Sequence, residues 1–187
     1  MRVIAGSAKG LKLTVPEGDA VRPTADRVRE ALMSALGGFF DGEEVLDLCA
    51  GSGAVGIELL SRGCGKAHFI EPGEQAAAAL ADNITRSQLH PRATVLRTDA
   101  ARAITVLQAA EQSFDFIYVD PPWEEDMHAE LVHAIATAGL LRAGGELIVE
   151  RDRRSSTPSP VLEGWELIWQ RNYGRTVIER LGLVSQP

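Results

Sequence analysis

Residues 120–123 of this 187-residue chain, Asp120-Pro121-Pro122-Trp123, place an acid, two prolines and an aromatic ring directly after an apolar stretch. That stretch, residues 114–119, has the aromatic and β-branched composition of a strand. Proline fixes φ and has no N–H, so the Asp120 carboxylate and the Pro121 carbonyl become two acceptors on a rigid turn. Two acceptors suit an exocyclic amine of a nucleobase, and stacking on Trp123 is worth about 1–3 kcal/mol per base in single-strand binding. The candidate catalytic residues are therefore Asp120, Pro121, Pro122 and Trp123, although a structural turn with Asp120 as a helix cap remains the alternative.

A glycine-rich turn, residues 51–56 (GSGAVG), follows the apolar residues 45–49 and precedes a helical pattern. Strand, glycine turn and helix in this order form the mononucleotide-binding half of a doubly wound sheet. Gly51 and Gly53 lack a Cβ, so the turn can be tight and a ligand can approach its backbone. GxGxxG alone is a weak signal that also fits a plain tight turn, but the flanking elements favour a nucleotide-like ligand.

Three acids accompany this turn. Glu71 ends the apolar residues 67–70, where it can accept hydrogen bonds from ribose hydroxyls. Asp99 follows residues 94–98 and can accept from an adenine amino group, although it suits the N-cap of the next helix equally well. Asp47 lies inside the first strand, where a carboxylate is expensive to bury unless turn N–H groups or a ligand ammonium compensate it. The candidate cofactor-binding residues are Asp47, Ala50, Gly51, Ser52, Gly53, Glu71, Asp99 and Ala100.

Strand and helix patterns alternate along the chain to position these residues. They predict a three-layer, doubly wound α/β fold with a mostly parallel, seven-stranded sheet. The last two strands have no room for a helix between them and should form a terminal antiparallel hairpin, and residues 1–15 read as a small N-terminal β-hairpin. We therefore divide the chain into a hairpin extension, residues 1–20, and a main domain, residues 21–187. Strands are expected at residues 45–49, 66–71, 94–98, 114–119, 145–150, 165–170 and 176–181, and helices after Thr24, after Gly56, and at residues 74–87, 100–110 and 125–138.

Composition limits the function classes. The net charge of −7 argues against a surface that is basic all over, as in non-specific nucleic-acid binders. Residues 1–30 and 151–180 are nevertheless locally basic, a feature that most often is solvated surface. The histidines and the two cysteines show neither metal-ligand spacing nor a disulfide framework. Without a signal-peptide pattern or an apolar run of the roughly 18 residues that a membrane span needs, we expect a cytoplasmic protein with no membrane and no metal.

The motifs at residues 47–53 and 120–123 together resemble those of class I S-adenosylmethionine-dependent amino-methyltransferases. Residues 22–32 (RPTADRVREAL) and the opening residues 2–6 (RVIAG) with Lys9-Gly10 narrow the resemblance. They are similar to the bacterial family that methylates the N2 amine of a guanine in 16S ribosomal RNA, the RsmD type. The resemblance covers nearly the whole chain, and Arg22-Pro23-Thr24 is its most specific part.

The resemblance implies a Rossmann-like, class I methyltransferase sheet, S-adenosylmethionine as methyl donor, and action on the small ribosomal subunit or a late assembly intermediate. Gly51 and Gly53 would line the donor, Glu71 would hold its ribose and Asp99 its adenine. Residues 120–123 would grip the target guanine, flipped out of its stack. The N-terminal hairpin and nearby arginines would contact RNA through Arg2, Lys9, Lys12, Arg22, Arg27 and Arg29.

Two positions depart from the family pattern. Glu71 is followed by Pro72-Gly73, where a second acid is common, so the ribose contact rests on Glu71 alone. Trp123 stands where phenylalanine or tyrosine is usual, which preserves stacking but could change the width of the pocket.

Three alternatives stay open. The acceptor platform would serve any exocyclic amine, so a DNA adenine-N6 methyltransferase fits, although no separate target-recognition domain is evident. A NAD-dependent oxidoreductase would explain residues 51–56 and Glu71 but not residues 120–123, and no catalytic histidine or tyrosine-lysine pair stands out. A binding module that has lost catalysis conflicts with the intact residues 120–123.

Overall fold

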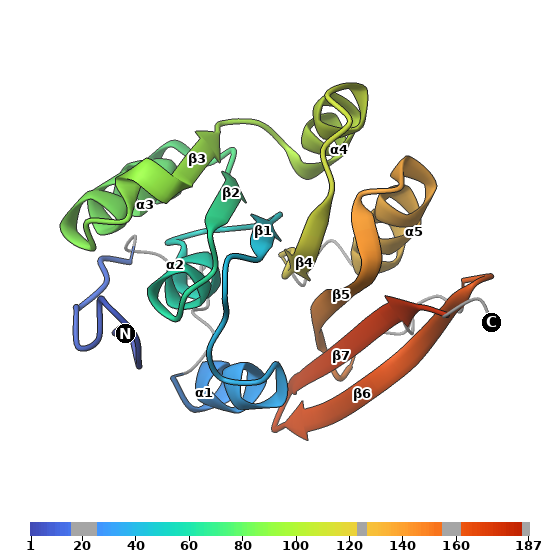
Figure 1. Ribbon diagram of the computed structural model, residues 1–187, viewed down its shortest axis with the longest axis horizontal. Coiled ribbons are helices and arrows are strands. Elements are labelled where there is room, and N and C mark those ends of the chain that lie inside the picture. Colours follow the sequence, from blue (N-terminus) through green and yellow to red (C-terminus); the bar gives the residue numbers. More distant parts are fainter. Residues whose placement is uncertain (16–25, 123–126, 155–161, 185–187) are drawn as a thin grey trace.

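A computed structural model of the chain describes residues 1–15, 26–122, 127–154 and 162–184, and within them seven strands form one sheet with helices on both faces (Figure 1). The strand order is β3-β2-β1-β4-β5-β7-β6. The strands are β1 (Glu44–Asp47), β2 (Lys66–Ile70), β3 (Ala93–Leu96), β4 (Phe114–Val119), β5 (Leu141–Asp152), β6 (Trp165–Tyr173) and β7 (Thr176–Leu183). The helices are α1 (Asp26–Ala35), α2 (Ala54–Ser61), α3 (Glu74–Arg86), α4 (Ala100–Ala109) and α5 (His128–Ala138), with one 3₁₀ turn, η1 (His90–Arg92).

Strands β1 to β5 are parallel, while β7 runs antiparallel to both of its neighbours, β5 and β6. The predicted doubly wound α/β fold, with one reversed strand in a terminal hairpin, is confirmed. The chain winds from β1 towards β3 on one side and from β4 towards β6 on the other. The gap between the carboxyl ends of β1 and β4 is therefore the switch point where such folds bind ligands.

Two apolar cores, one on each face of the sheet, hold the three layers together. Helices α1, α2 and α3 cover one face, and α4 and α5 cover the other. Neighbouring residues of β1 point to opposite faces, Val45 to the first core and Leu46 to the second. Strands buried on both faces need near-continuous apolar sequence, which is why β1, β2 and β4 could be recognised from their composition.

Strand β5 is longer than its apolar run. We expected residues 151–160 to form a loop, but the strand continues through Arg151 and Asp152, and residues 155–161 lie outside the described residues. Arg151 pairs with Val177 and Asp152 with Thr176 of β7, and the Arg151 guanidinium bonds the Glu179 carboxylate at 2.7 Å. Backbone pairing with β7 and charge pairing across it extend the strand where hydrophobicity alone does not.

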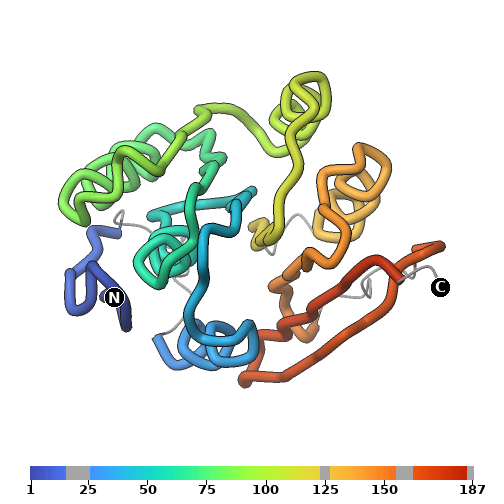
Figure 2. Tube along the Cα trace, in the orientation of Figure 1, coloured from blue at the N-terminus to red at the C-terminus, as the bar shows by residue number. Residues whose placement is uncertain are grey.

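The N-terminal segment, residues 1–15, is a minimal hairpin held by an isolated antiparallel bridge between Arg2 and Lys12. Val3 and Leu13 are buried in the core that α2 and α3 share. The tube in Figure 2 shows the segment beside α2 and α3, on the opposite side of the molecule from the C-terminal end. The expected cap Thr24 and residues 16–20 of the expected extension lie outside the described residues.

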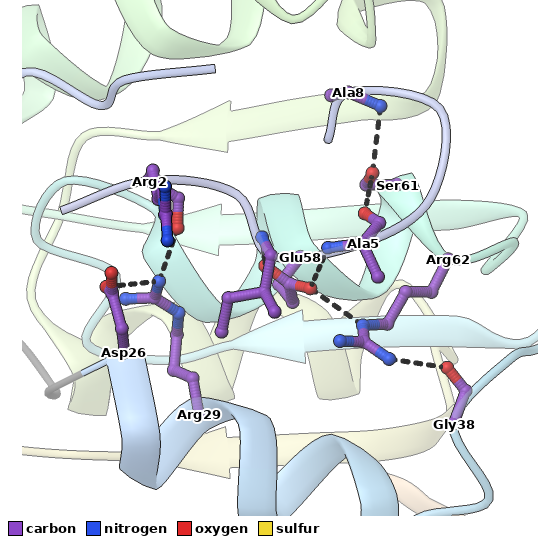
Figure 3. Close-up of polar contacts among 10 residues, drawn as sticks. Arg2, Ala5, Ala8, Asp26, Arg29, Gly38, Glu58, Ser61 and Arg62 are labelled. Carbon is purple, nitrogen blue, oxygen red and sulfur yellow. Dashed lines mark hydrogen bonds and ion pairs between the residues drawn. The ribbon is translucent and has the colours of Figure 1, made fainter. Parts of the chain in front are cut away.

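Helix α2 anchors this segment through two polar side chains (Figure 3). Glu58, fully buried, accepts from the backbone N–H of Ile4 at 2.7 Å and of Ala5 at 3.0 Å, and pairs with Arg62 at 2.7 Å. Ser61 donates to the Ala5 carbonyl and accepts from the Ala8 N–H. Residues 1–15 are therefore an integral layer on α2 and not a loosely attached extension.

Candidate functional site

The carboxyl ends of three neighbouring parallel strands, β4, β1 and β2, meet at one edge of the sheet. The backbone N–H of Leu48 donates to the Tyr118 carbonyl at 2.9 Å, which joins the ends of β1 and β4. The N–H of Ala50 donates to the Ile70 carbonyl at 2.9 Å, which joins the ends of β1 and β2. The glycine turn after β1 thus begins between the tips of its two neighbours.

The glycine turn has the backbone that its sequence predicts. Gly51 and Gly53 have φ of +54° and +80°, a left-handed conformation that residues with a Cβ rarely adopt. A Cβ on Gly53 would also lie 2.4 Å from Cδ1 of Leu80. Gly56, one turn into the pattern, lets α2 pack closely on the sheet, because a Cβ there would lie 2.3 Å from the Phe69 ring.

The Glu71 carboxylate is fixed against the glycine turn. One oxygen accepts from the Gly51 N–H at 2.8 Å and the other from the Gly73 N–H at 2.7 Å. Each carboxylate oxygen has a further lone pair, so Glu71 can still accept from a ligand hydroxyl. The sequence predicted the position of this acid at the tip of β2 but not its bond to the turn.

Asp47 is buried beneath α2, and its two carboxylate oxygens differ in their hydrogen bonding. Its Oδ2 accepts from the Gly56 N–H at 3.0 Å. Its Oδ1 is buried and has no hydrogen-bond partner among the described residues, a rare state for a buried polar atom. The Asp47 pKa is raised to about 7, because burial, together with the nearby charge of Glu71, outweighs the lowering effect of the Gly56 hydrogen bond. An acceptor of this kind fits a cationic or N–H-bearing group of a ligand.

Asp120 lies beside the glycine turn through a contact with Cys49. Both the backbone and the charge of Asp120 lie close enough to the Cys49 thiol to act on it. Burial raises the Cys49 pKa above its usual range, and the charges of Asp120, Asp47 and Glu71 add to the rise. The structure therefore brings these three predicted acids to one small region at the switch point.

The remaining platform residues differ in exposure. Pro121 is buried and Pro122 is exposed, while Asp120 is half-buried. Trp123 lies outside the described residues, so its stacking role stays a prediction.

Asp99 is the N-cap of α4, the alternative to adenine binding that its sequence position also allowed. Its Oδ1 accepts from the Arg102 N–H at 2.8 Å, which caps α4. The side chain is exposed at the carboxyl end of β3, and Ala100 beside it is half-buried. A contact of Asp99 with adenine stays a prediction.

The expected RNA-contacting residues divide into two groups. Arg2, Lys9, Lys12 and Arg27 are exposed, and Arg22 lies outside the described residues. Arg29 is fully buried, and its Nη2 donates to the Arg2 carbonyl at 2.6 Å and to Asp26 at 2.9 Å (Figure 3). The expectation that Arg29 meets RNA is wrong, because its guanidinium is used to hold the N-terminal segment.

The tip of the N-terminal hairpin lies away from the glycine turn. Ser7 and Ala8, next to Lys9, bond Ser61 at the last residue of α2. Helix α2 has eight residues and rises 1.5 Å per residue, so its two ends are about 12 Å apart. Lys9 is thus at the far end of α2 from Gly53.

Asn83 is a site residue that sequence reasoning missed. Its amide is buried, donates to the Ser52 carbonyl at 2.9 Å and the Thr14 carbonyl at 2.8 Å, and accepts from the Thr14 N–H at 2.8 Å. It therefore joins the glycine turn to the N-terminal segment. The available signal was a polar residue on the apolar stripe of α3, three residues after Leu80.

Within the part of the chain that the structure describes, no helix is both long and apolar enough to cross a membrane. The same residues contain no group of three or more histidine, cysteine or acidic side chains that could hold a metal ion.

Comparisons with known proteins place the chain among close relatives. The family described as Conserved hypothetical protein 95 matches residues 1–181. YlbH of Bacillus subtilis (strain 168) is 38% identical over 86% of this chain and 88% of its own length. Ribosomal RNA small subunit methyltransferase D of Escherichia coli (strain K12) is 31% identical over 89% of this chain and 82% of its own. The solved structure of yhhF from Escherichia coli superposes with a TM-score of 0.85 at 28% identity, covering 100% of this chain and 99% of that one.

Proposed function

The chain belongs to the family described as Conserved hypothetical protein 95, and we propose that it transfers a methyl group from S-adenosylmethionine to the exocyclic N2 amine of a guanine in small-subunit ribosomal RNA. The resemblance to the RsmD type is confirmed at the level of the family, since relatives named ribosomal RNA small subunit methyltransferase D align over most of the chain. This membership favours a methyltransferase over an oxidoreductase. The donor, the nitrogen that is modified and the base are our proposal.

One observation carries the proposal. Asp120 lies against Cys49, directly before the glycine turn and close to Asp47 and Glu71. This proximity supports the proposal that residues 120–122 hold the amine and the glycine turn holds the donor at one switch point, as transfer between two bound substrates requires.

The acids around the glycine turn fit a positively charged donor. S-adenosylmethionine supplies a methyl group on a cationic sulfur, together with an ammonium, a ribose and an adenine. Gly51 and Gly53 would approach it through their backbones, and Glu71 would accept from the ribose hydroxyls. The buried Oδ1 of Asp47, which has no hydrogen-bond partner among the described residues, fits the ammonium side of the donor. Asp99 would accept from the adenine with the lone pairs that capping leaves.

Asp120 and the Pro121 carbonyl act on the acceptor. An exocyclic amine is a weak nucleophile because its lone pair is delocalised into the ring. Two acceptors that hold both N–H bonds orient that lone pair, and the gain comes mainly from positioning. The methylated nitrogen is acidic enough to lose its proton to water or to Asp120, so no separate base is required.

The RNA must present a flipped guanine, because an N2 amine inside a stack is not accessible. Contacts to phosphates position the protein and the pocket selects the base. Arg2, Lys9, Lys12 and Arg27 are exposed and could supply part of these contacts. The whole small subunit or a late assembly intermediate is the proposed substrate.

The test incubates the purified protein and labelled S-adenosylmethionine with small subunits that lack the modification, followed by nucleoside analysis. We expect label in N2-methylguanosine. Parallel arms with protein-free 16S RNA and with duplex DNA distinguish the assembled particle from the alternative substrates. Label in methyladenine of DNA, or in no nucleoside although the protein binds donor, would contradict the proposal.

A further inference from the structure

Four exposed arginines gather where β5 ends and where β6 turns into β7. We call them the arginine cluster: Arg153, Arg154, Arg171 and Arg175. Two belong to the turn after β5, one to the end of β6 and one to the β6–β7 turn. The backbone N–H of Arg153 donates to the Arg175 carbonyl at 2.7 Å, so the two turns are in contact.

The acids of this region are buried and paired, so its exposed charge is positive. Asp152 bonds the Arg175 side chain and the Arg154 N–H. Glu179 pairs with Arg151, and Glu150 accepts from the Tyr118 hydroxyl at 2.5 Å. Residues 150–154 and 170–176 present no exposed acid, although the chain as a whole has a net charge of −7.

The arginine cluster lies on the edge of the sheet that carries Asp120. Strands β4 and β5 are parallel and pair Val119 with Val149, so Asp120 is the neighbour of Glu150. Strand β6 ends at this edge and β7 begins there, because the turn that joins them, at residues 173–176, lies beside the end of β5. From β4 to β6 there are three strand spacings, about 14 Å in all. The nucleotides on either side of a base held by Asp120 can span this distance.

The face of the sheet also agrees. Trp169 and Tyr173 pack against the core beneath α1 and α2, and Arg171 lies between them on the same face, since alternate residues of a strand share a face. The Arg171 guanidinium lies over the Trp169 ring at 5.7 Å. Tyr118, near the end of β4, belongs to the same core, so Arg171 lies on the side of the sheet to which Tyr118 points.

We propose that the arginine cluster is a second RNA-contacting surface, which binds backbone phosphates next to the nucleotide held by Asp120. This inference rests on the proposed function. Guanidinium groups bind phosphate oxygens in a bidentate manner, and arginine is the residue that favours such contacts. Lys9 cannot take this place, because it lies at the far end of α2. The two surfaces would bind the RNA on two sides of the target base.

The test measures RNA affinity against salt concentration for Arg154→Gln, Arg171→Gln and the double variant. Arg175 is left unchanged because it neutralises Asp152. The matched control is Lys66→Gln, an exposed cation at the amino end of β2, on the opposite edge of the sheet. The ligands are unmodified small subunits and protein-free 16S RNA.

Each phosphate contact contributes about 0.7–0.9 to the slope of log affinity against log salt. We expect each single arginine variant to flatten the slope by that amount, the double variant by about twice as much, and Lys66→Gln by nothing. Donor affinity and the unfolding midpoint should match those of the unchanged protein. A slope equal to the control would overturn the inference.

Two further outcomes separate the inference from the proposed function. If the variants lose affinity for subunits but keep it for protein-free RNA, the cluster docks on a protein and the assignment to RNA is wrong. If the unchanged protein transfers no methyl group to RNA, the proposed function fails, while the slopes still decide whether the cluster binds phosphate.

Discussion

The Glu71 carboxylate accepts a hydrogen bond from the Gly51 backbone N–H at 2.8 Å, so the tip of β2 holds the turn that follows β1. The same carboxylate holds Gly73 through its other oxygen. The acid therefore has a structural task, shaping the turn, in addition to the proposed contact with ribose.

Replacing Glu71 with alanine should weaken donor binding. Loss of charged hydrogen bonds costs about 1.5–3 kcal/mol, which corresponds to at least about tenfold in affinity. Calorimetric titration with S-adenosylmethionine measures the change, and Glu74→Ala, an exposed acid on α3, is the control. Unchanged affinity would exclude Glu71 from the donor site.

Replacing Asp120 with alanine should abolish methyl transfer and leave donor affinity nearly intact, because the contact with Cys49 uses the Asp120 backbone. Asp120→Asn keeps one acceptor oxygen and should retain a small residual rate. Single-turnover rates and donor titration separate the two effects. An equal loss of both in Asp120→Ala would contradict the assigned role.

Replacing Asn83 with alanine should destabilise the protein by about 2–4 kcal/mol, because the buried Ser52 carbonyl and the part-buried backbone groups of Thr14 lose their partner. Urea unfolding measures the change, with Gln75→Ala on the exposed face of α3 as control. Equal midpoints for both variants would mean that the three bonds of Asn83 contribute nothing.

Stability should depend on pH through Asp47. The Asp47 pKa rises from 3.8 to about 7 on folding. As pH rises from about 4 to 7, Asp47 therefore loses its proton in the unfolded chain before it does so in the folded protein, and the folded state loses stability. At about 1.4 kcal/mol per pH unit, the loss between pH 5 and pH 8 is about 3 kcal/mol.

The measurement for Asp47 compares the free energy of unfolding of Asp47→Asn with that of the unchanged protein, without donor, across this pH range. The difference should move in favour of the variant as pH rises. A constant difference would show that the Asp47 pKa does not change on folding.

Deleting residues 1–15 should destabilise the whole domain. The core would lose the buried side chains of Val3 and Leu13, each worth about 1.5–3 kcal/mol when fully buried, and Glu58 would lose its bonds to Ile4 and Ala5. A test of RNA contact therefore needs point changes such as Lys9→Gln. If the truncated protein unfolds at the same urea concentration as the full chain, the segment is separable after all.

The fold was predictable because its evidence is local. The apolar strand runs, the glycine turn and the short gap between β6 and β7 each lie within a few residues. Gly53 could be assigned to a tight turn from its type and position alone, and its left-handed φ agrees.

The links between elements were not predictable, because they join residues far apart in the chain. Thr14 and Asn83 are 69 residues apart, and no local pattern pairs them. The prediction that Arg29 contacts RNA is wrong because it rests on the charge of neighbouring residues. The spacing to Leu32 and Met33 instead places Arg29 on the buried stripe of α1. A helical period that includes a charged residue indicates a buried partner for it.

Helix α2 carries the glycine turn at its first residue and the N-terminal segment at its last. Gly6 there admits no side chain, because a Cβ would lie 1.8 Å from the Ser61 carbonyl oxygen. One short, stiff spacer therefore sets the separation between the two attachments. An engineered chain that takes the N-terminal segment of a relative should therefore take α2 as well. Otherwise the segment would be attached at the wrong distance from the glycine turn.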